Sequence, residues 1–230
     1  MVTDSGAFDD AGLNVTDPND RLGVKADYIS LLQGMALQAL MPDGRGRALE
    51  IGCGHGRLTP AITGLGFETI GLDPSLRLLR LARERLPRQP FCAGALPDLP
   101  FADASFEAVF LINVLRPLHL MGIKESVDDV ARVIAPGGYL FVLDNLRESD
   151  SRYVTDDWIT GRFRGLGLVL ETRQPVRRGR WLGVLAIRYG LVPRRWLPAI
   201  ARHELARMAQ RTRIPRWTYD NVVYVFRRPL

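Results

Sequence analysis

Short apolar runs and amphipathic segments alternate along this chain. Residues 27–40 carry apolar side chains close to helical spacing, and the proline and glycine that follow from Pro42 end this segment. Residues 48–52 come next as an apolar run of strand length that ends in glycine. The same alternation predicts further strands at residues 68–72, 90–93, 107–113, 139–143, 166–171 and 221–226, and helices at residues 58–65, 75–86, 125–134 and 156–163.

The order of these elements indicates the fold class. Strands that alternate with helices of this length are typical of βαβ units, in which helices cover both faces of a parallel sheet. We therefore expect an α/β protein with a mostly parallel, seven-stranded sheet. Residues 1–22 are polar and predict a flexible N-terminal lead-in, and the main domain is expected over residues 23–174 and 218–230.

Residues 175–217 interrupt the alternation with many arginines and several aromatic residues. Within them Leu197, Ala201, Leu205 and Met208 are spaced like one face of a helix, so we expect a helical insertion before the last strand. The insertion either packs on the domain with its arginines in solvent, or acts as a lid, a substrate-specificity element or a dimer contact. A membrane-binding or nucleic-acid-binding surface is a further alternative.

Charge and cysteine content narrow the class of protein. The chain has 230 residues and a formal net charge of +6, but residues 172–230 hold 14 arginines against two acids, Glu204 and Asp220. Two cysteines form neither a disulfide framework nor a metal cluster, which favours the reducing cytoplasm. We expect no membrane span, because no apolar run approaches the roughly 18 residues that one needs, and no signal peptide, because the N-terminus is acidic.

The glycines after the first predicted strand indicate a ligand-binding loop. Residues 50–56 read EIGCGHG, with glycines at Gly52, Gly54 and Gly56. A dinucleotide fingerprint requires G-x-G-x-x-G, but Arg57 occupies the position of its third glycine. A phosphate-binding P-loop is also excluded here, since no Gly-Lys-Ser/Thr follows.

Four motifs in this order resemble those of the class I S-adenosylmethionine-dependent methyltransferases. Residues 50–56 match the first motif of that family, acid-x-Gly-x-Gly-x-Gly, and Asp73 matches the acid that ends its second strand. Residues 99–109 (LPFADASFEAV) and 132–138 (RVIAPGG) match its third and fourth motifs. The resemblance implies a Rossmann-like, doubly wound sheet, S-adenosylmethionine as cofactor and S-adenosylhomocysteine as product.

The resemblance also implies how the cofactor is held. Bare backbone in the glycine loop lets the amino-acid tail and the ribose approach closely. Glu50 orients this loop or meets the cationic amino group, and Asp73 accepts hydrogen bonds from both ribose hydroxyls. The implied cofactor residues are Glu50, Gly52, Cys53, Gly54, Gly56, Asp73, Pro74, Ala95, Leu96 and Asn113.

Ala95 departs from the family pattern. Many relatives carry an aspartate there, which accepts a hydrogen bond from the adenine amino group. Backbone atoms of Ala95 and Leu96 remain available to pair with the adenine edge. We expect the missing carboxylate to weaken cofactor binding by about 1 kcal/mol, the usual contribution of one hydrogen bond.

Three residues are candidates for the transfer step, and each has a plainer structural alternative. His119 follows the fourth strand and could act as a base, or it only caps or packs a short helix. Asp144 follows the fifth strand and could face the acceptor, or it holds a turn. Tyr28 could cover the sulfonium with its ring, or it is a core residue.

The functional hypothesis is methyl transfer to an oxygen or nitrogen, less favourably a carbon, of a small-molecule acceptor in biosynthesis. Arginines such as Arg116 would suit an acidic acceptor. One alternative is an S-adenosylmethionine-binding enzyme that catalyses a cyclisation, elimination or rearrangement. Another is an RNA-directed or non-catalytic protein that uses the basic C-terminal quarter. A homodimer through the insertion remains open, and no metal is expected.

Overall fold

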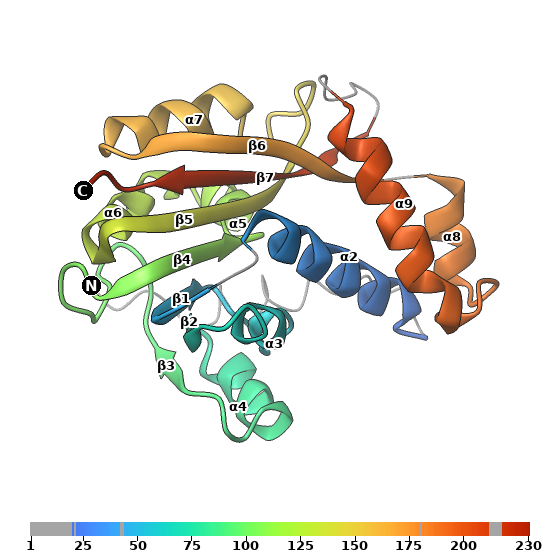
Figure 1. The fold of residues 1–230 in the computed structure, drawn as a ribbon, viewed down its shortest axis with the longest axis horizontal. Helices are drawn as coiled ribbons and strands as arrows, with labels where there is room; N and C mark the ends of the chain where they lie inside the picture. Colours follow the sequence, from blue (N-terminus) through green and yellow to red (C-terminus); the bar gives the residue numbers. More distant parts are fainter. Residues whose placement is uncertain (1–19, 21, 42–43, 180, 212–217) are drawn as a thin grey trace.

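A twisted seven-stranded sheet forms the centre of the protein (Figure 1). The computed structural model describes residues 20, 22–41, 44–179, 181–211 and 218–230, so the expected lead-in at residues 1–22 lies almost wholly outside the described residues. The strand order is β3-β2-β1-β4-β5-β7-β6. The strands are β1 (Arg47–Ile51), β2 (Glu68–Asp73), β3 (Phe91–Ala93), β4 (Phe106–Ile112), β5 (Ile134–Leu146), β6 (Val169–Arg178) and β7 (Asp220–Arg227).

One strand runs against the others. Strands β1 to β5 pair in parallel, whereas β7 lies antiparallel between β5 and β6. The carboxyl ends of β1 to β6 and the start of β7 therefore meet at one edge, called here the carboxyl edge. This arrangement confirms the expected α/β fold and the mostly parallel sheet, and in such sheets ligands bind at this edge.

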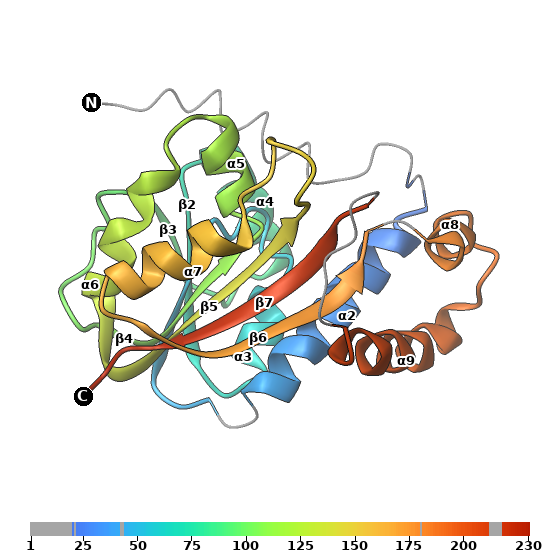
Figure 2. The same cartoon turned by 90° about the horizontal axis from the view of Figure 1, so that it is seen from above.

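Helices cover both faces of the sheet (Figure 2). One face carries α2 (Val24–Leu40), α3 (Thr59–Thr63), α8 (Leu182–Arg188) and α9 (Leu197–Ala209). The other carries α5 (Leu115–Leu120), α6 (Val130–Val133) and α7 (Asp156–Gly165), while α4 (Leu76–Arg85) lies beside β2 and β3. Two 3-10 turns, η1 (Lys124–Asp129) and η2 (Arg194–Trp196), precede α6 and α9.

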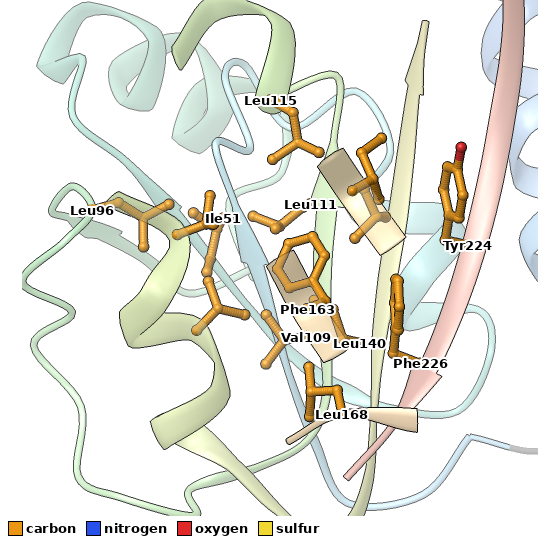
Figure 3. Close-up of a cluster of buried hydrophobic side chains, with 14 of the residues drawn as sticks. Ile51, Leu96, Val109, Leu111, Leu115, Leu140, Phe163, Leu168, Tyr224 and Phe226 are labelled. Carbon is orange, nitrogen blue, oxygen red and sulfur yellow. The ribbon is translucent and has the colours of Figure 1, made fainter. Parts of the chain in front are cut away.

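Alternate side chains of each strand feed two separate hydrophobic cores. Val109 and Leu111 of β4 enter the core under α5 to α7, whereas Ala108 and Phe110 enter the core under α2, α3, α8 and α9. Figure 3 shows the first of these cores, in which strand side chains gather with Leu115 of α5 and Phe163 of α7. Burial on both sides explains why the central strands read as continuous apolar runs.

Two strands are longer than their sequence pattern predicts. β5 begins at Ile134 and includes the proline and glycines that were expected to separate it from a helix, because the chain after β7 pairs with them: Gly137 donates to the carbonyl of Arg228 at 2.9 Å. β6 continues to Arg178, and Pro175 is tolerated because it lies at a register shift of an edge strand. The residues from 175 to 178 therefore belong to the sheet, and helical structure begins only at Leu182.

Candidate functional site

A pocket opens at the carboxyl edge, between the loops that follow β1, β2, β3 and β4. Nine of the ten expected cofactor residues line it: Glu50, Gly52, Cys53, Gly54, Asp73, Pro74, Ala95, Leu96 and Asn113. Gly56 is the exception. The remaining lining residues are Ile51, His55, Arg57, Leu58, Leu78, Gly94, Ile112, Val114, Pro117 and Leu118.

The glycine loop forms the floor of this pocket. Gly52 and Gly54 have φ angles of 71° and 56°, which L side chains rarely adopt. The backbone N–H groups of Gly52 and Cys53 donate to the carbonyl of Leu72 at 2.7 and 3.0 Å, so the loop is fixed to the end of β2. A Cβ atom at Gly54 would meet no protein atom nearer than 4.0 Å, so this glycine keeps ligand space open.

Gly56 has a packing role instead. A Cβ atom there would lie 2.9 Å from Leu86 Cδ1 and 3.3 Å from the ring of Phe91. The third glycine of the motif therefore lets the loop pack against the end of α4 and against β3. Gly56 is not among the residues that line the pocket, so its expected role at the cofactor stays a prediction.

Asp73 ties the second strand to the glycine loop. Its Oδ2 accepts from the backbone N–H of Gly54 at 2.7 Å, and its Oδ1 accepts from the N–H of Ser75 at 2.9 Å. Ser75 in turn caps α4 by accepting from the N–H of Leu78 at 3.1 Å. An oxygen of an ionised carboxylate can accept more than one hydrogen bond, which suits a ligand that presents two hydroxyl groups.

Glu50 is a buried carboxyl group in the pocket wall. It is 3% exposed, and its Oε2 accepts from the hydroxyl of Thr59 at 2.5 Å. Burial raises the pKa of Glu50 to about 7, against the smaller opposing effects of Thr59 and Arg57. A buried carboxylate without a bonded cation is costly, so this position favours a cationic ligand group.

Arg57, the residue that departs from the dinucleotide fingerprint, lines the pocket. Its guanidinium donates to Ser30 Oγ at 3.1 Å and to Gln33 Oε1 at 2.8 Å, and both partners belong to α2. Burial lowers the pKa of Arg57 to about 10, which still leaves it charged at neutral pH. Arg57 therefore joins the glycine loop to the helix that covers it.

Tyr28 does not lie at the pocket, so its interpretation as a cover for a sulfonium is wrong. The side chain is fully buried, and its hydroxyl donates to Glu204 Oε2 on α9. Leu32, one helical turn further along α2, is buried in the same core. The phase of α2 therefore turns Tyr28 toward α9 rather than toward the pocket.

Asp144 and His119 lie behind the pocket wall. Asp144 is fully buried and accepts from the backbone N–H groups of Leu115 and Arg116 at 2.8 and 3.2 Å, so it fixes the first turn of α5. Burial raises the pKa of Asp144 to about 6. His119 Nε2 lies 2.7 Å from the carbonyl oxygen of Ser151 and must donate to it, which ties α5 to the segment after β5. Neither residue is part of the pocket lining.

A stack of charged and aromatic side chains adjoins the pocket along the carboxyl edge. The guanidinium of Arg116 lies 4.8 Å from the ring centroid of Tyr153, which stacks on Tyr219 with centroids 6.1 Å apart. The guanidinium of Arg177 lies 5.5 Å from the centroid of the Tyr219 ring and donates to the Tyr219 hydroxyl at 3.3 Å. The buried Nε of Arg116 has no hydrogen-bond acceptor among the described residues. Sequence spacing gives no signal for this stack, because its members come from four separate segments.

Fold and pocket together define an α/β protein with a nucleoside-type cofactor site rather than a dinucleotide site. Residues 49–142 match the family model described as a methyltransferase domain. This match agrees with the resemblance of the four sequence motifs to the class I S-adenosylmethionine-dependent methyltransferases. The pocket fits the cofactor of these enzymes, because it offers two carboxyl groups, Glu50 and Asp73, and a glycine floor with open space at Gly54. Among the described residues, no cluster of metal-ligating side chains is present.

Known proteins resemble this chain over part of their length. An uncharacterised methyltransferase of Mycobacterium tuberculosis is 30% identical over 53% of this chain and 49% of its own. The demethylmenaquinone methyltransferase of Renibacterium salmoninarum is 30% identical over 59% of both chains. The chain thus spans about half the length of the curated relatives it matches. The solved structure of the [4+2]-cyclase SpnF superimposes with a TM-score of 0.63 at 18% identity, over 86% of this chain and 81% of that one, which shows the fold alone.

Proposed function

We propose that this protein transfers a methyl group from S-adenosylmethionine to an oxygen or nitrogen atom of a small-molecule acceptor. The observation that carries the proposal is the gathering of nine expected cofactor residues in one pocket at the carboxyl edge. The cofactor supplies an activated methyl group when it is bound. The protein then has to bind the cofactor and the acceptor, orient them and exclude water from between them, since alignment of donor and acceptor is the main requirement of such a displacement.

Two carboxyl groups bind different parts of the cofactor. Glu50 accepts the cationic amino group, whose charge offsets the cost of ionising a buried carboxyl. Asp73 accepts from the ribose hydroxyls while its bond to Gly54 holds the loop at the required distance. Apolar residues such as Leu78 and Leu118 exclude water from the remaining walls.

The acceptor is proposed to be acidic and to lie on the part of the stack formed by Arg116, Tyr153 and Tyr219, since Arg177 is only 3% exposed. Arg116 lies between two pocket residues, Val114 and Pro117, so it stands at the passage from the pocket to the stack. The Arg116 side chain is half-buried, and a carboxylate, phosphate or phenolate of the substrate would give its guanidinium a charge-assisted hydrogen-bond partner. The tyrosine rings suit a planar or apolar body attached to that group.

Asp144 and His119 act in this proposal as positioning residues. Asp144 holds the first turn of α5, which carries Arg116, and His119 holds the segment that carries Tyr153. Neither side chain lines the pocket, so the proposal includes no protein base. It relies on an acceptor atom that is already ionised or that loses its proton readily. A reducing compartment such as the cytoplasm is part of the proposal, because Cys53 and Cys92 are both free thiols.

The test of methyl transfer uses cofactor carrying an isotopically labelled methyl group. The purified chain is incubated with this cofactor and a panel of small phenols, carboxylic acids and amines, and the products are analysed by mass. We expect one acceptor class to gain the labelled methyl with an equal amount of S-adenosylhomocysteine. Conversion of a substrate without loss of the label would instead assign a cyclisation, elimination or rearrangement, and failure to bind either form of the cofactor would overturn the site.

The acidic character of the acceptor has its own test. Arg116→Met should raise the KM for carboxylated members of the panel at least about tenfold, the cost of losing one charge-assisted hydrogen bond, and leave uncharged analogues unaffected. Arg152→Met serves as the matched control, because Arg152 is exposed and pairs with Asp150 outside the stack. An equal loss for charged and uncharged acceptors would reject the assignment of Arg116.

A further inference from the structure

Helix α8 is apolar on both of its faces. Val184 and Ile187 point inward and join the core against α2. Leu182, Leu185 and Tyr189 occupy the opposite, solvent side, and Leu182 is 84% exposed. A surface helix ordinarily presents polar residues outward, so the outer face of α8 is suited to an apolar environment.

The exposed apolar surface continues beyond the helix. Leu191 and Trp196 follow α8, and Leu22 adjoins Gly190, where an added Cβ atom would lie 3.0 Å from Leu22 Cδ1. We name this surface the α8 patch; it comprises Leu22, Leu182, Leu185, Tyr189, Leu191 and Trp196. Of the twelve large exposed hydrophobic residues in the described part of the chain, five thus fall within residues 182–196, and the sixth, Leu22, lies beside Gly190. Such a concentration marks an interaction site.

Arginines lie within and beside the α8 patch. Residues 182–211 contain six arginines and one acid, Glu204, although Arg194 pairs with Asp27 and Arg211 with Asp220. Arg188 lies over the ring of Tyr189 at 5.4 Å, and the exposed Arg195 directly precedes Trp196. Exposed leucines with tryptophan, tyrosine and arginine form the combination that inserts into the interface of an anionic bilayer. A second copy of this chain would bring like charges together.

The α8 patch lies toward the carboxyl edge of the sheet, where the pocket is also found. β6 ends at Arg178 on the carboxyl edge, and α8 starts at Leu182, so only a short connection separates the two. Figures 1 and 2 both show α8 at the outer end of the molecule, beyond α2 and away from the sheet. Contact through α8 would therefore leave the sheet free and bring the carboxyl edge near the contacted surface.

We propose that the α8 patch docks this protein on an anionic lipid bilayer. The leucines and the two aromatic residues enter the interface, and the arginines meet lipid phosphates. Docking of this kind is peripheral and reversible, and among the described residues no helix is long and apolar enough to cross a membrane. The proposal concerns a binding surface and does not depend on which reaction the pocket carries out.

Vesicle co-sedimentation of the full chain tests the proposal. We expect binding to phosphatidylcholine vesicles that contain phosphatidylglycerol, weak binding to phosphatidylcholine alone, and a decrease as salt rises. Leu182→Asp should reduce partitioning at least about tenfold, because the burial of one leucine is lost and a like charge is added. Val169→Asp is the matched control: Val169 is 54% exposed at the opposite end of β6, and the charge change is the same.

Three outcomes would overturn the proposal. The first is that the parent protein fails to bind the anionic vesicles. The second is that Leu182→Asp and Val169→Asp reduce binding equally, which would assign the effect to net charge. The third concerns sedimentation without lipid: the parent is a dimer, and Leu182→Asp converts it to a monomer that still binds lipid. This result would assign the α8 patch to contact with a second copy of the chain. Unfolding midpoints of both variants verify that each is folded.

Discussion

Replacement of Glu50 by glutamine should stabilise the protein without cofactor and weaken the binding of cofactor. Glu50 lies buried in the pocket wall with the hydroxyl of Thr59 as its hydrogen-bond donor. Glutamine keeps an oxygen for that bond and removes the ionisable group. The variant therefore separates the cost of a buried carboxyl group from its use in binding.

The magnitude follows from the pKa of Glu50, which burial raises from 4.5 to about 7. Below pH 4.5 the group is protonated in both folded and unfolded chains and contributes nothing. As the pH rises toward 7 the unfolded chain loses this proton first, so the folded state becomes relatively less stable. Above pH 7 the loss is complete, and at about 1.4 kcal/mol per pKa unit it reaches about 3 kcal/mol.

The assay compares urea unfolding of parent and Glu50→Gln at pH 5.5 and pH 8.5. The advantage of the variant should grow by about 2 kcal/mol between these values, which for a chain of this size is about 4–8 °C in melting temperature. Any constant cost of the new amide cancels in this difference. Glu148→Gln, which changes an exposed carboxyl, should show no such growth.

Calorimetry with S-adenosylmethionine supplies the second half of the test. The parent should bind more tightly at pH 8 than at pH 6, because Glu50 is then ionised, whereas Glu50→Gln should bind weakly at both. The reasoning is refuted if the variant is destabilised equally at pH 5.5 and pH 8.5. It is also refuted if the variant binds the cofactor as tightly as the parent at pH 8.

Three further predictions address the pocket and its support. Gly56→Ala should lower the free energy of unfolding in urea by about 2–3 kcal/mol through strain and overpacking, and should keep the cofactor affinity. Gly54→Ala should lower the free energy of unfolding less but should lose cofactor affinity. The reverse order would contradict the roles given to the two glycines. Asp73→Ala should abolish detectable cofactor binding in calorimetry while the chain stays folded by circular dichroism, and retained binding would reject the site. Tyr28→Phe should cost about 1–3 kcal/mol, because buried Glu204 loses a donor, and any change in kcat of the folded variant would restore Tyr28 as a candidate near the reaction.

The strands and the cofactor loop could be predicted from the sequence because their signals are local. Apolar runs at β1 and β4 reflect burial on both faces, and the spacing of Gly52 and Gly54 reflects a backbone conformation that other residues adopt with difficulty. The predicted ends of β5 and β6 are wrong because the true ends depend on contacts with residues far away in the sequence. Their extra residues pair with the distant strand β7 or with the chain after it, and these contacts override the local breaking tendency of Pro136 and Pro175.

The candidates for the transfer step show a second limit of sequence reasoning. The position of His119 and Asp144 near the ends of strands indicated the correct edge of the sheet but not the direction of each side chain. Asp144 is turned inward by two backbone N–H groups of α5, and His119 is held by the carbonyl of Ser151. Tyr28 was misplaced because its partner Glu204 lies 176 residues away in the chain.

The two halves of the candidate site also differ in how close together their residues lie in the sequence. Eight of the nineteen residues that line the cofactor half belong to one segment, residues 50–58, so substitutions there disturb loop conformation and binding together. The stack beside it draws Arg116, Tyr153, Arg177 and Tyr219 from four separate segments of the chain, and none of them belongs to the glycine loop. Acceptor preference should therefore respond to Arg116→Met while the affinity for S-adenosylmethionine stays within about twofold of the parent, as expected for sites with few shared contacts. If both change together, the stack and the cofactor pocket form a single unit, and the acceptor must be recognised elsewhere on the carboxyl edge.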